Sequence, residues 1–320
     1  MSVIDFAIKE LKPATIEKAQ IELNEIHESF PSSIQQFRQI ILDNEGLNGC
    51  LEDAFLLRFL RARKYDMQKA LALYLNHYAI RQQYPDVFEN LKPSLVRHVF
   101  VTGIVSMLPE ATSEGHRILL FRPALWQPDE WPSSDLLRAN VIVVEDLLQN
   151  YHEAQVHGLV VLVSLSGFGW KHACQLSNLD FARRAARLLQ DTTPVRVKAV
   201  HMVNEPAMFS RVFGLVQPLL KPKQQRRIIF HGNSLKSLHT YLPPHLLPCN
   251  IGLEGTGPPV PSPDYCAHLQ SMEGYFEFMQ QFTVSPRATT DKNGKQSPSV
   301  GTLQTASDSH IEPSLLNNST

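Results

Sequence analysis

Apolar positions in the first part of the chain recur at helical spacing. Ile34, Phe37 and Ile41 lie three and four residues apart, which places them on one face of an α-helix. Asp66 precedes another such segment, where its carboxylate can accept a hydrogen bond from the first helical turn. No alternation of apolar and polar residues typical of a strand interrupts this region. We therefore predict a helical domain over residues 1–90.

After this region the pattern changes to short apolar runs rich in branched residues, separated by helical stretches. The predicted strands cover residues 116–121, 158–166, 195–203 and 227–231, and the predicted helices cover 134–151, 171–189 and 206–220. Strands that alternate with helices of this length predict an α/β domain, with a mixed, mainly parallel sheet covered by helices, over residues 91–282. The remaining residues, 283–320, are rich in Ser, Thr, Pro, Asn and Gly, so we predict a disordered tail.

Composition narrows the class of protein. A chain of 320 residues, 43% of them hydrophobic, can bury a core without disulfide bonds. The longest apolar run, residues 158–169, is too short to cross a bilayer, and the N-terminus lacks the basic start and apolar stretch of a signal peptide. The four cysteines form no CxxC pair and are interpreted as reduced thiols. We expect a cytoplasmic protein.

The net charge of −1 hides a segregation of charge along the chain. Residues 1–55 hold ten acids and four cations, whereas residues 183–227 hold ten cations and two acids. Arg196 and Lys198 are two positions apart in a predicted strand, so both should face the same side. Such a basic segment is most simply a solvated face, but it also suits an anionic lipid surface. No aromatic stacking platform accompanies it, so we predict no nucleic-acid partner.

Motifs for catalysis are lacking in the sequence. His152 and His157 are five residues apart, so on a helix they would point about 140° apart, whereas a zinc-protease motif needs a spacing of four. Ser166 lacks the glycine two positions earlier that a nucleophile elbow requires. The chain also has neither of the glycine-rich phosphate-binding loops. We predict a protein that is not an enzyme, with no metal and no cofactor.

The predicted helix at 206–220 is unusually apolar, and Pro206 is placed to begin it. One stripe of this helix contains Phe209, Val212, Phe213 and Val216. Such a helix is either buried in the core or is a lid over an apolar cavity or membrane. Periodicity by itself favours the core. The basic residues that flank this segment favour the lid.

Three motifs resemble those of one family. Residues 53–63 resemble the N-terminal helical signature of CRAL-TRIO proteins, and residues 195–206 and 230–239 resemble their lipid-domain signatures. Their order and spacing match from about residue 10 to 280, so the chain is identified as a member of the CRAL-TRIO lipid-binding family, most similar to its tocopherol transfer branch. The resemblance implies a CRAL-TRIO fold, in which a helical N-terminal domain precedes an α/β domain that encloses a lipid cavity. It also implies that residues 206–220 are a mobile helix that closes this cavity.

The resemblance also implies where a lipid and a membrane would be bound. The cavity wall would include Leu137, Asn140, Val144, Leu159, Val163, Leu188, Leu189, Val195 and Val200, and the lid would add Phe209, Val212, Phe213 and Val216. Phosphoinositide contacts would fall on Arg63, Arg196, Lys198, Lys223 and Arg227. Independently of the family, Leu159 and Val163 have the same parity in one predicted strand and should share a face. Val144 offers no hydrogen-bonding group to a ligand hydroxyl, which argues against tocopherol itself.

We therefore predict a cytoplasmic, monomeric carrier, peripheral on endosomal or other phosphoinositide-bearing membranes. It would bind one hydrophobic lipid, which could be tocopherol-like, retinoid-like or a phospholipid, and exchange it through the lid helix. The expected membrane partner is an anionic surface with phosphatidylinositol bisphosphate. The alternative is a phosphoinositide-sensing trafficking adaptor that acts through protein partners.

Overall fold

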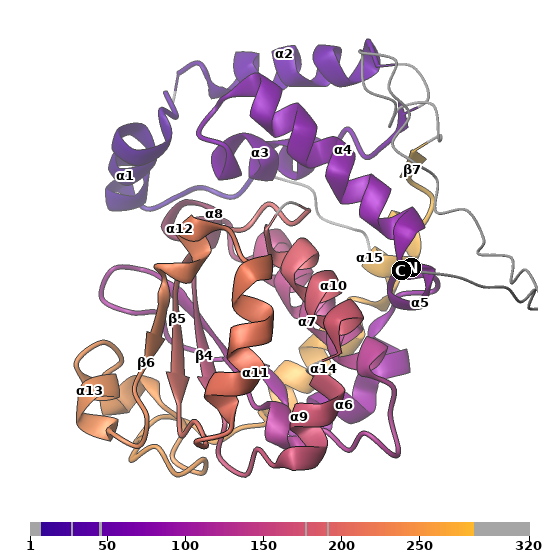
Figure 1. Ribbon diagram of the computed structural model, residues 1–320. Coiled ribbons are helices and arrows are strands. Elements are labelled where there is room, and N and C mark those ends of the chain that lie inside the picture. Colours follow the sequence, from indigo (N-terminus) through magenta and orange to yellow (C-terminus); the bar gives the residue numbers. More distant parts are fainter. Residues whose placement is uncertain (1–7, 27, 45–46, 177, 191, 285–320) are drawn as a thin grey trace, which may run out of the picture.

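A computed structural model describes residues 8–26, 28–44, 47–176, 178–190 and 192–284 of the chain. Its N-terminal helices form a layer over a body that contains a sheet and its covering helices (Figure 1). The boundary predicted between residues 90 and 91 falls between the last short helix of this layer and the next segment. The predicted disordered tail lies outside the described residues, apart from its first two.

The N-terminal segment is helical, as predicted. Its helices are α1 (Pro13–Leu23), α2 (Phe30–Leu42), α3 (Asp53–Ala62), α4 (Met67–Gln83) and α5 (Pro85–Phe88). The Asp66 carboxylate accepts a hydrogen bond of 3.0 Å from the Lys69 backbone amide and caps α4, which confirms the predicted helix start.

One small sheet was not predicted. β1 (Leu47–Asn48) pairs in antiparallel fashion with β7 (Thr283–Val284). The prediction of a helical region without strands is wrong at β1, and the first two residues of the predicted tail form β7. A strand of two residues has no alternating pattern that a sequence could display, and its partner lies at the other end of the described chain.

The main sheet confirms the predicted α/β class. Its strands are β2 (Val105–Met107), β3 (Arg117–Phe121), β4 (Leu159–Ser164), β5 (Val197–Val203) and β6 (Ile228–Phe230), in the spatial order β2-β3-β4-β5-β6. The pairs from β3 to β6 are parallel, and the edge strand β2, which was not predicted, is antiparallel to β3. The sheet is therefore mixed and mainly parallel.

Helices connect and cover these strands. They are α6 (Arg97–Thr102), α7 (Ser133–Asn150), α8 (His152–His157), α9 (Trp170–Leu176), α10 (Leu179–Gln190), α11 (Phe209–Val216), α12 (Pro222–Gln225), α13 (Leu235–His239), α14 (Pro263–Ser271) and α15 (Glu273–Met279). Short 3-10 turns lie at η1 (Pro93–Val96), η2 (Pro123–Leu125), η3 (Gln217–Leu219) and η4 (Pro244–Leu246).

Two of the predicted helices differ in detail from those in the structure. The predicted helix at 171–189 is two helices, α9 and α10. The helix predicted to begin at Pro206 begins at Phe209, because the Pro206 carbonyl accepts a hydrogen bond of 2.8 Å from the Phe209 amide in a preceding turn. Pro206 therefore belongs to the turn that leads into α11.

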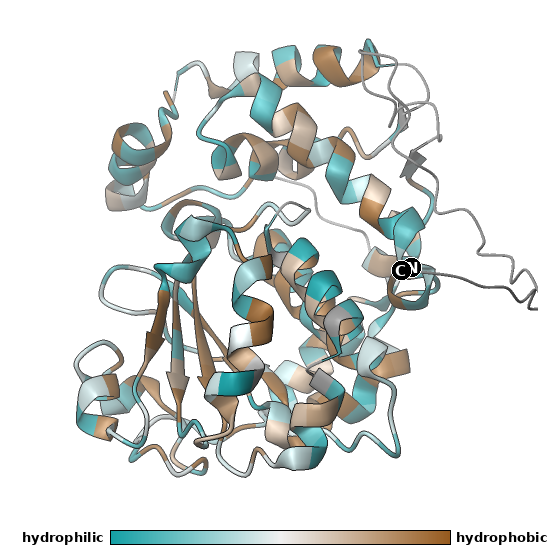
Figure 2. Ribbon diagram, viewed as in Figure 1, coloured by the Kyte–Doolittle hydropathy of each residue, from teal (hydrophilic) through white to brown (hydrophobic). Residues whose placement is uncertain are grey.

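The two faces of the sheet pack against different partners. On one face, Val160 and Leu162 of β4 join a buried cluster with Leu238 of α13 and with the segment that follows this helix. The opposite face turns toward α7, α10 and α11. Figure 2 shows that the strands are predominantly hydrophobic, as expected for a sheet covered on both faces.

The largest buried cluster joins the N-terminal layer to α7. Phe55 and Phe59 of α3 and Leu147 and Leu148 of α7 belong to it. Because one continuous core includes both parts, the helical layer forms a wall of the α/β body.

Candidate functional site

A cavity of about 890 Å³ lies between the inner face of the sheet, α7, α10 and α11, with α3 and α4 on a further side. Eight of the nine predicted wall residues line this cavity, namely Leu137, Asn140, Val144, Leu159, Val163, Leu188, Val195 and Val200. The side chain of the ninth, Leu189, lies outside the described residues. The wall is mostly aliphatic and aromatic, so the cavity is suited to an apolar molecule.

Strand parity accounts for the contribution of β4. Leu159, Val161 and Val163 line the cavity, while Val160 and Leu162 belong to the cluster on the other face. The predicted shared face of Leu159 and Val163 is confirmed.

α11 covers the cavity with one side and meets solvent with the other. Phe209, Phe213 and Val216 line the cavity, and the side chain of Val212 lies outside the described residues. Leu215, on the same helix, is 53% exposed. The interpretation of this segment as a fully buried core helix, which periodicity favoured, is therefore wrong.

Aromatic rings hold α11 in place. The Phe209 ring lies 5.8 Å from that of Phe168, which follows β4, at an interplanar angle of 85°. The Phe213 ring lies 5.0 Å from Phe230 at the end of β6. These ring contacts between α11 and the body are apolar, so displacement of the helix would expose apolar surface.

Cationic side chains gather at one part of the cavity rim. All five residues predicted to contact phosphoinositide border the cavity, together with three lysines, and we call this set the basic cluster: Arg63, Lys64, Lys69, Arg196, Lys198, Lys221, Lys223 and Arg227. Arg227 and, to a lesser extent, burial and the charges of Lys64, Arg196 and Arg63 lower the pKa of Lys223. Like charges thus lie close enough to repel one another, which is the arrangement expected of an anion site.

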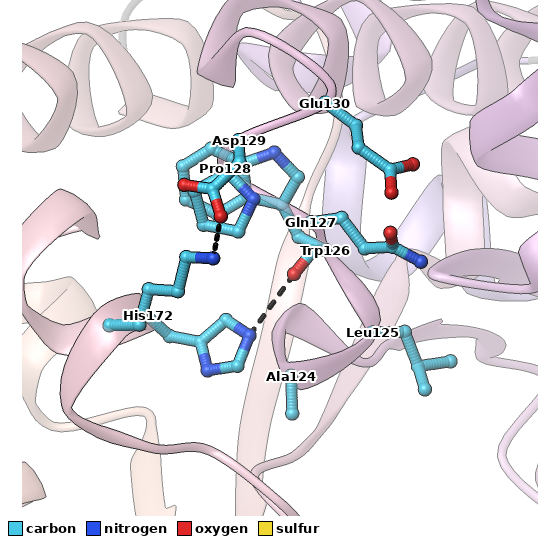
Figure 3. Close-up of a pocket in the computed structure, with 9 residues that line it drawn as sticks. Ala124, Leu125, Trp126, Gln127, Pro128, Asp129, Glu130 and His172 are labelled. Carbon is cyan, nitrogen blue, oxygen red and sulfur yellow. Dashed lines mark hydrogen bonds and ion pairs between the residues drawn. The ribbon is translucent and has the colours of Figure 1, made fainter.

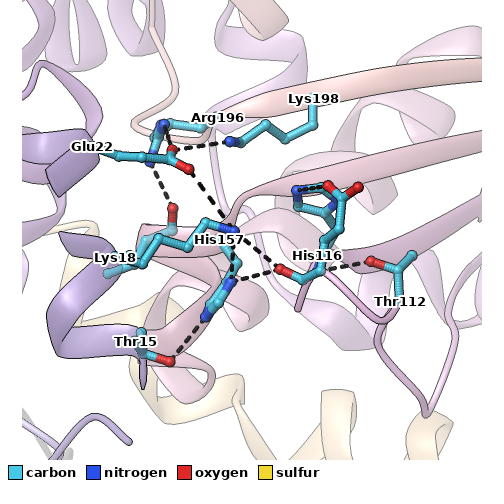
Figure 4. A network of polar contacts seen from close by, with 10 residues as sticks. Thr15, Lys18, Glu22, Thr112, His116, His157, Arg196 and Lys198 are labelled. Atoms are coloured by element: carbon cyan, nitrogen blue, oxygen red, sulfur yellow. Dashed lines mark hydrogen bonds and ion pairs between the residues drawn. The ribbon is translucent and has the colours of Figure 1, made fainter. Parts of the chain in front are cut away.

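An acid from the N-terminal layer reaches into the basic cluster. Glu22 of α1 accepts hydrogen bonds from Arg196 at 2.9 Å and from Lys198 at 3.2 Å (Figure 4). Burial by itself would raise the pKa of Glu22, but these two hydrogen bonds and charges outweigh it and lower the pKa to about 2. The shared contact also confirms that Arg196 and Lys198 face the same side.

Further polar contacts dock α1 on the body around Glu22. Thr15 Oγ1 lies 2.9 Å from His157 Nε2, and Lys18 Nζ lies 3.2 Å from His157 Nδ1 (Figure 4). Lys18 also donates to the Glu114 carbonyl at 3.1 Å. These contacts place Glu22 where it meets the basic cluster, and the charge pattern alone did not predict them.

The cavity wall also contains polar residues that sequence reasoning missed. His77 and Arg81 of α4 and Glu145 of α7 line the cavity. Arg81 Nη2 lies 3.8 Å from the Glu145 carboxylate, which also accepts a hydrogen bond of 2.8 Å from Arg58. Helical spacing on α4 could have placed His77 and Arg81 on one face of the helix. It could not have shown that this face lines the cavity.

A second, smaller hollow of about 410 Å³ lies near the start of α9 (Figure 3). His172 Nε2 lies 3.1 Å from the Trp126 carbonyl oxygen, and Lys171 forms an ion pair with Asp129. None of the predicted site residues lines it.

Over the described ranges, no group of three His, Cys, Asp or Glu side chains could hold a metal ion. His152 accepts a hydrogen bond of 3.1 Å from the Lys9 amide, and His157 contacts α1, so the two histidines have separate partners. Among the helices of the described part of the chain, none has the length and apolar character needed to cross a membrane.

Comparison with known proteins places the chain in a family. The CRAL/TRIO domain profile matches residues 102–252, and a Pinta-like UBA domain profile matches residues 26–97. The chain belongs to the CRAL/TRIO family, as its motifs predicted. This membership supports the prediction that the protein is not an enzyme.

Individual relatives cover most of the chain. It is 37% identical over 277 residues to the alpha-tocopherol transfer protein-like protein of Pongo abelii. The aligned region covers 86% of this chain and 79% of that protein. The Homo sapiens protein of the same name is 37% identical, over 83% of this chain and 77% of that protein. Clavesin-1 of Xenopus laevis is 36% identical, over 78% of this chain and 75% of that protein. The crystal structure of Sfh5 has a TM-score of 0.49 and 9% identity over 85% of this chain and 98% of that one, too distant a likeness to add to this assignment.

Proposed function

We propose that the protein carries one hydrophobic lipid in the cavity and exchanges it at phosphoinositide-containing membranes by displacement of α11. The observation that carries the proposal is the combination of a largely apolar cavity of about 890 Å³, an apolar helix across it and a basic cluster at its rim. Burial of apolar area at about 25 cal/mol per Å² retains a lipid without a covalent bond.

The same arrangement accounts for release at a membrane. α11 has an exposed Leu215 on its outer side and apolar contacts on its inner side. A membrane that binds the displaced helix more tightly than the closed one shifts the equilibrium toward the open state. An anionic surface attracts the basic cluster with about 1 kcal/mol per cation near the surface. The names of the relatives, which include a transfer protein-like protein, agree with this function.

The first test is the identity and exchange of bound lipid. Native mass spectrometry of the purified protein should show one bound lipid, and vesicles with phosphatidylinositol bisphosphate should accelerate its release. A protein recovered without lipid that also takes up none from vesicles would contradict the carrier function.

The second test concerns α11. Leu215→Asp should leave a loaded lipid in place but slow its transfer to vesicles about tenfold, because a charged side chain resists entry into the membrane interface. The matched control is Leu42→Asp on α2, where the leucine is also exposed, at 56%, but does not line the cavity. Equal transfer rates for the two variants would show that α11 is not the membrane-contacting helix.

A further inference from the structure

Two histidines of α8 do not line the cavity, and both contact the segment that contains α1. The backbone amide of Lys9, which precedes α1, donates to His152 Nδ1 at 3.1 Å. Thr15 Oγ1 of α1 lies 2.9 Å from His157 Nε2 (Figure 4). The spacing of five residues, which argues against a zinc site, therefore serves two separate contacts with one docked segment.

The hydrogen bonds fix the tautomer of each neutral ring. Because a backbone amide only donates, His152 Nδ1 accepts and carries no hydrogen. His157 Nδ1 lies 2.8 Å from the Glu114 carbonyl oxygen, which only accepts. This nitrogen therefore carries the hydrogen, and Nε2 accepts from the Thr15 hydroxyl.

Protonation of either ring would weaken the contact with α1. On His152, the added proton would face the hydrogen of the Lys9 amide, so that one donor would meet another. On His157, the added charge would lie beside the ammonium group of Lys18, whose Nζ is 3.2 Å from Nδ1. The neutral rings therefore bind the segment, and the charged rings would repel it.

The surroundings of His152 oppose its charge. Burial and the charges of Arg61, Lys9 and Arg58 lower the pKa of His152 to about 4, although a hydrogen bond to the Gln149 backbone acts in the opposite sense. Because Lys9 belongs to the docked segment, release of this segment would both hydrate the ring and remove one of the three cations.

The surroundings of His157 are mixed. The charged and titratable side chains that face it are Lys18, Glu22, Glu153 and His116. Burial lowers the pKa of His157 and Lys18 adds to this, whereas a hydrogen bond to the Glu114 backbone and the two carboxylates act in the opposite sense. Burial also lowers the pKa of His116 to about 4, so His116 stays neutral in the range where a hydrated histidine takes up a proton.

The apolar part of the α1 dock is small. Ala19 and Leu23 of α1 form a buried cluster with Val156 of α8, separate from the large core cluster. Polar contacts therefore contribute much of the docking free energy. A change in the charge of α8 can shift the equilibrium between a docked and a released helix.

We propose that His152 and His157 form an acid-sensitive dock for α1, and that release of α1 exposes Arg196 and Lys198 to an anionic membrane. This inference rests on the proposed function and adds its regulation, because α1 carries the carboxylate of Glu22 that pairs with both cations. Glu22 itself stays charged in mild acid, since its pKa is about 2. The histidines of α8 therefore set the pH at which the membrane site opens.

Hydrogen exchange of the full chain at pH 7.5 and pH 5.5, corrected for the intrinsic rates, tests the dock. A histidine with a pKa of 6.5 when released and about 4 when docked weakens docking about tenfold at pH 5.5, because the released state binds more protons. We expect exchange of residues 8–23 to accelerate by this factor, while α7, in the large core cluster, stays protected. Equal exchange at both pH values, or an acceleration shared by α7, would overturn the proposal.

Variants assign the effect to the two rings. The double variant His152→Asn with His157→Gln keeps acceptors for the Lys9 amide and the Thr15 hydroxyl but does not titrate, so its exchange should not depend on pH. The control His245→Gln removes a histidine at an exposed position and should keep the acceleration. An acceleration that persists in the double variant would overturn the role of these histidines.

Vesicles of phosphatidylcholine and phosphatidylglycerol, whose charge is constant over this pH range, test the consequence. In a sedimentation assay the unaltered protein should bind about fivefold more tightly at pH 5.5 than at pH 7.5, and the double variant should lose most of this gain. Release of α1 without a gain in binding would overturn the regulation and leave the carrier function intact. Absence of binding at either pH would contradict the proposed membrane exchange and, with it, this regulation.

Discussion

At the scale of single residues, the buried arginines of α3 are the least expected feature. Arg61 is 2% exposed and forms a two-pronged contact with Glu25 at 2.7 and 2.8 Å, while its third nitrogen donates to Gln155 at 3.0 Å. A charge without water is tolerated only when it is hydrogen-bonded, and here each of the three guanidinium nitrogens donates to an oxygen. Loss of either Arg61 or Glu25 would therefore leave the other charge buried without its ion-pair partner.

Removal of one partner should be costly. We expect Glu25→Gln to lower the free energy of unfolding by about 3–5 kcal/mol, because it leaves the Arg61 charge buried and unpaired. The double variant Glu25→Gln with Arg61→Met should recover much of this loss. Chemical denaturation provides the measurement, with Lys69→Met as a control, since its exposed pair with Asp66 should contribute at most about 1 kcal/mol. A loss for Glu25→Gln as small as that of the control would contradict the prediction.

At the scale of elements, the contact between α1 and the basic cluster connects the two parts of the molecule. Glu22 forms ion pairs with Arg196 and Lys198, two of the five cations that the family resemblance assigns to phosphoinositide. An incoming phosphate must then compete with this carboxylate. On the proposed function, α1 reduces the affinity of the cluster for headgroups.

Neutralising Glu22 tests this competition. Glu22→Gln should strengthen binding to vesicles with phosphatidylinositol bisphosphate about fivefold, because Arg196 and Lys198 become available, and the effect should shrink at high salt. Glu17→Gln, at an exposed position of the same helix, should change little, and Lys223→Glu should weaken binding. A vesicle-sedimentation assay measures all three. Weaker binding by Glu22→Gln would mean that Glu22 orients the cations instead of competing for them.

At the scale of the whole molecule, histidines in separate elements make the fold sensitive to acid. Burial lowers the pKa of His116, of His152 and of His201 to about 4, below the 6.5 of an unfolded chain. Between these pH values the unfolded state binds more protons, so the free energy of unfolding falls as the pH falls through this window. His268 acts in the opposite sense, because its hydrogen bond to Asp146 raises its pKa and adds stability below about pH 6.5.

Calorimetry at two pH values tests whether the histidines with a lowered pKa outweigh His268 in the stability of the fold. Burial also lowers the pKa of His77, of His157 and of His231, so six histidines act in one sense and one in the other. We therefore expect the melting temperature to be several degrees lower at pH 5 than at pH 7.5 at constant ionic strength. His201→Gln should reduce this difference, whereas His245→Gln, at an exposed position, should not. The same melting temperature at both pH values would contradict the prediction.

Much of the architecture could be predicted from local pattern. Helical spacing predicted the N-terminal layer, alternation of strands and helices predicted the mainly parallel sheet, and the family motifs anticipated the cavity and its covering helix. Strand parity sufficed for the shared face of Leu159 and Val163, because adjacent residues of a strand always point to opposite faces. The very short strands β1, β2 and β7 were missed, because two or three residues carry no periodic signal. β6 is equally short, at three residues, and was predicted from its run of branched and aromatic residues, Ile228-Ile-Phe230.

The sequence by itself thus determined which elements form, which residues of each are apolar, and that acids and cations lie in different segments. Only the tertiary structure decided that Arg61 is buried against Glu25, that Glu22 meets Arg196, and that His77 contacts the Thr192 carbonyl. Each of these is a contact between segments far apart in the chain. Local periodicity reports the side of an element on which a residue lies, but the partner of that side is set by the packing of the whole molecule.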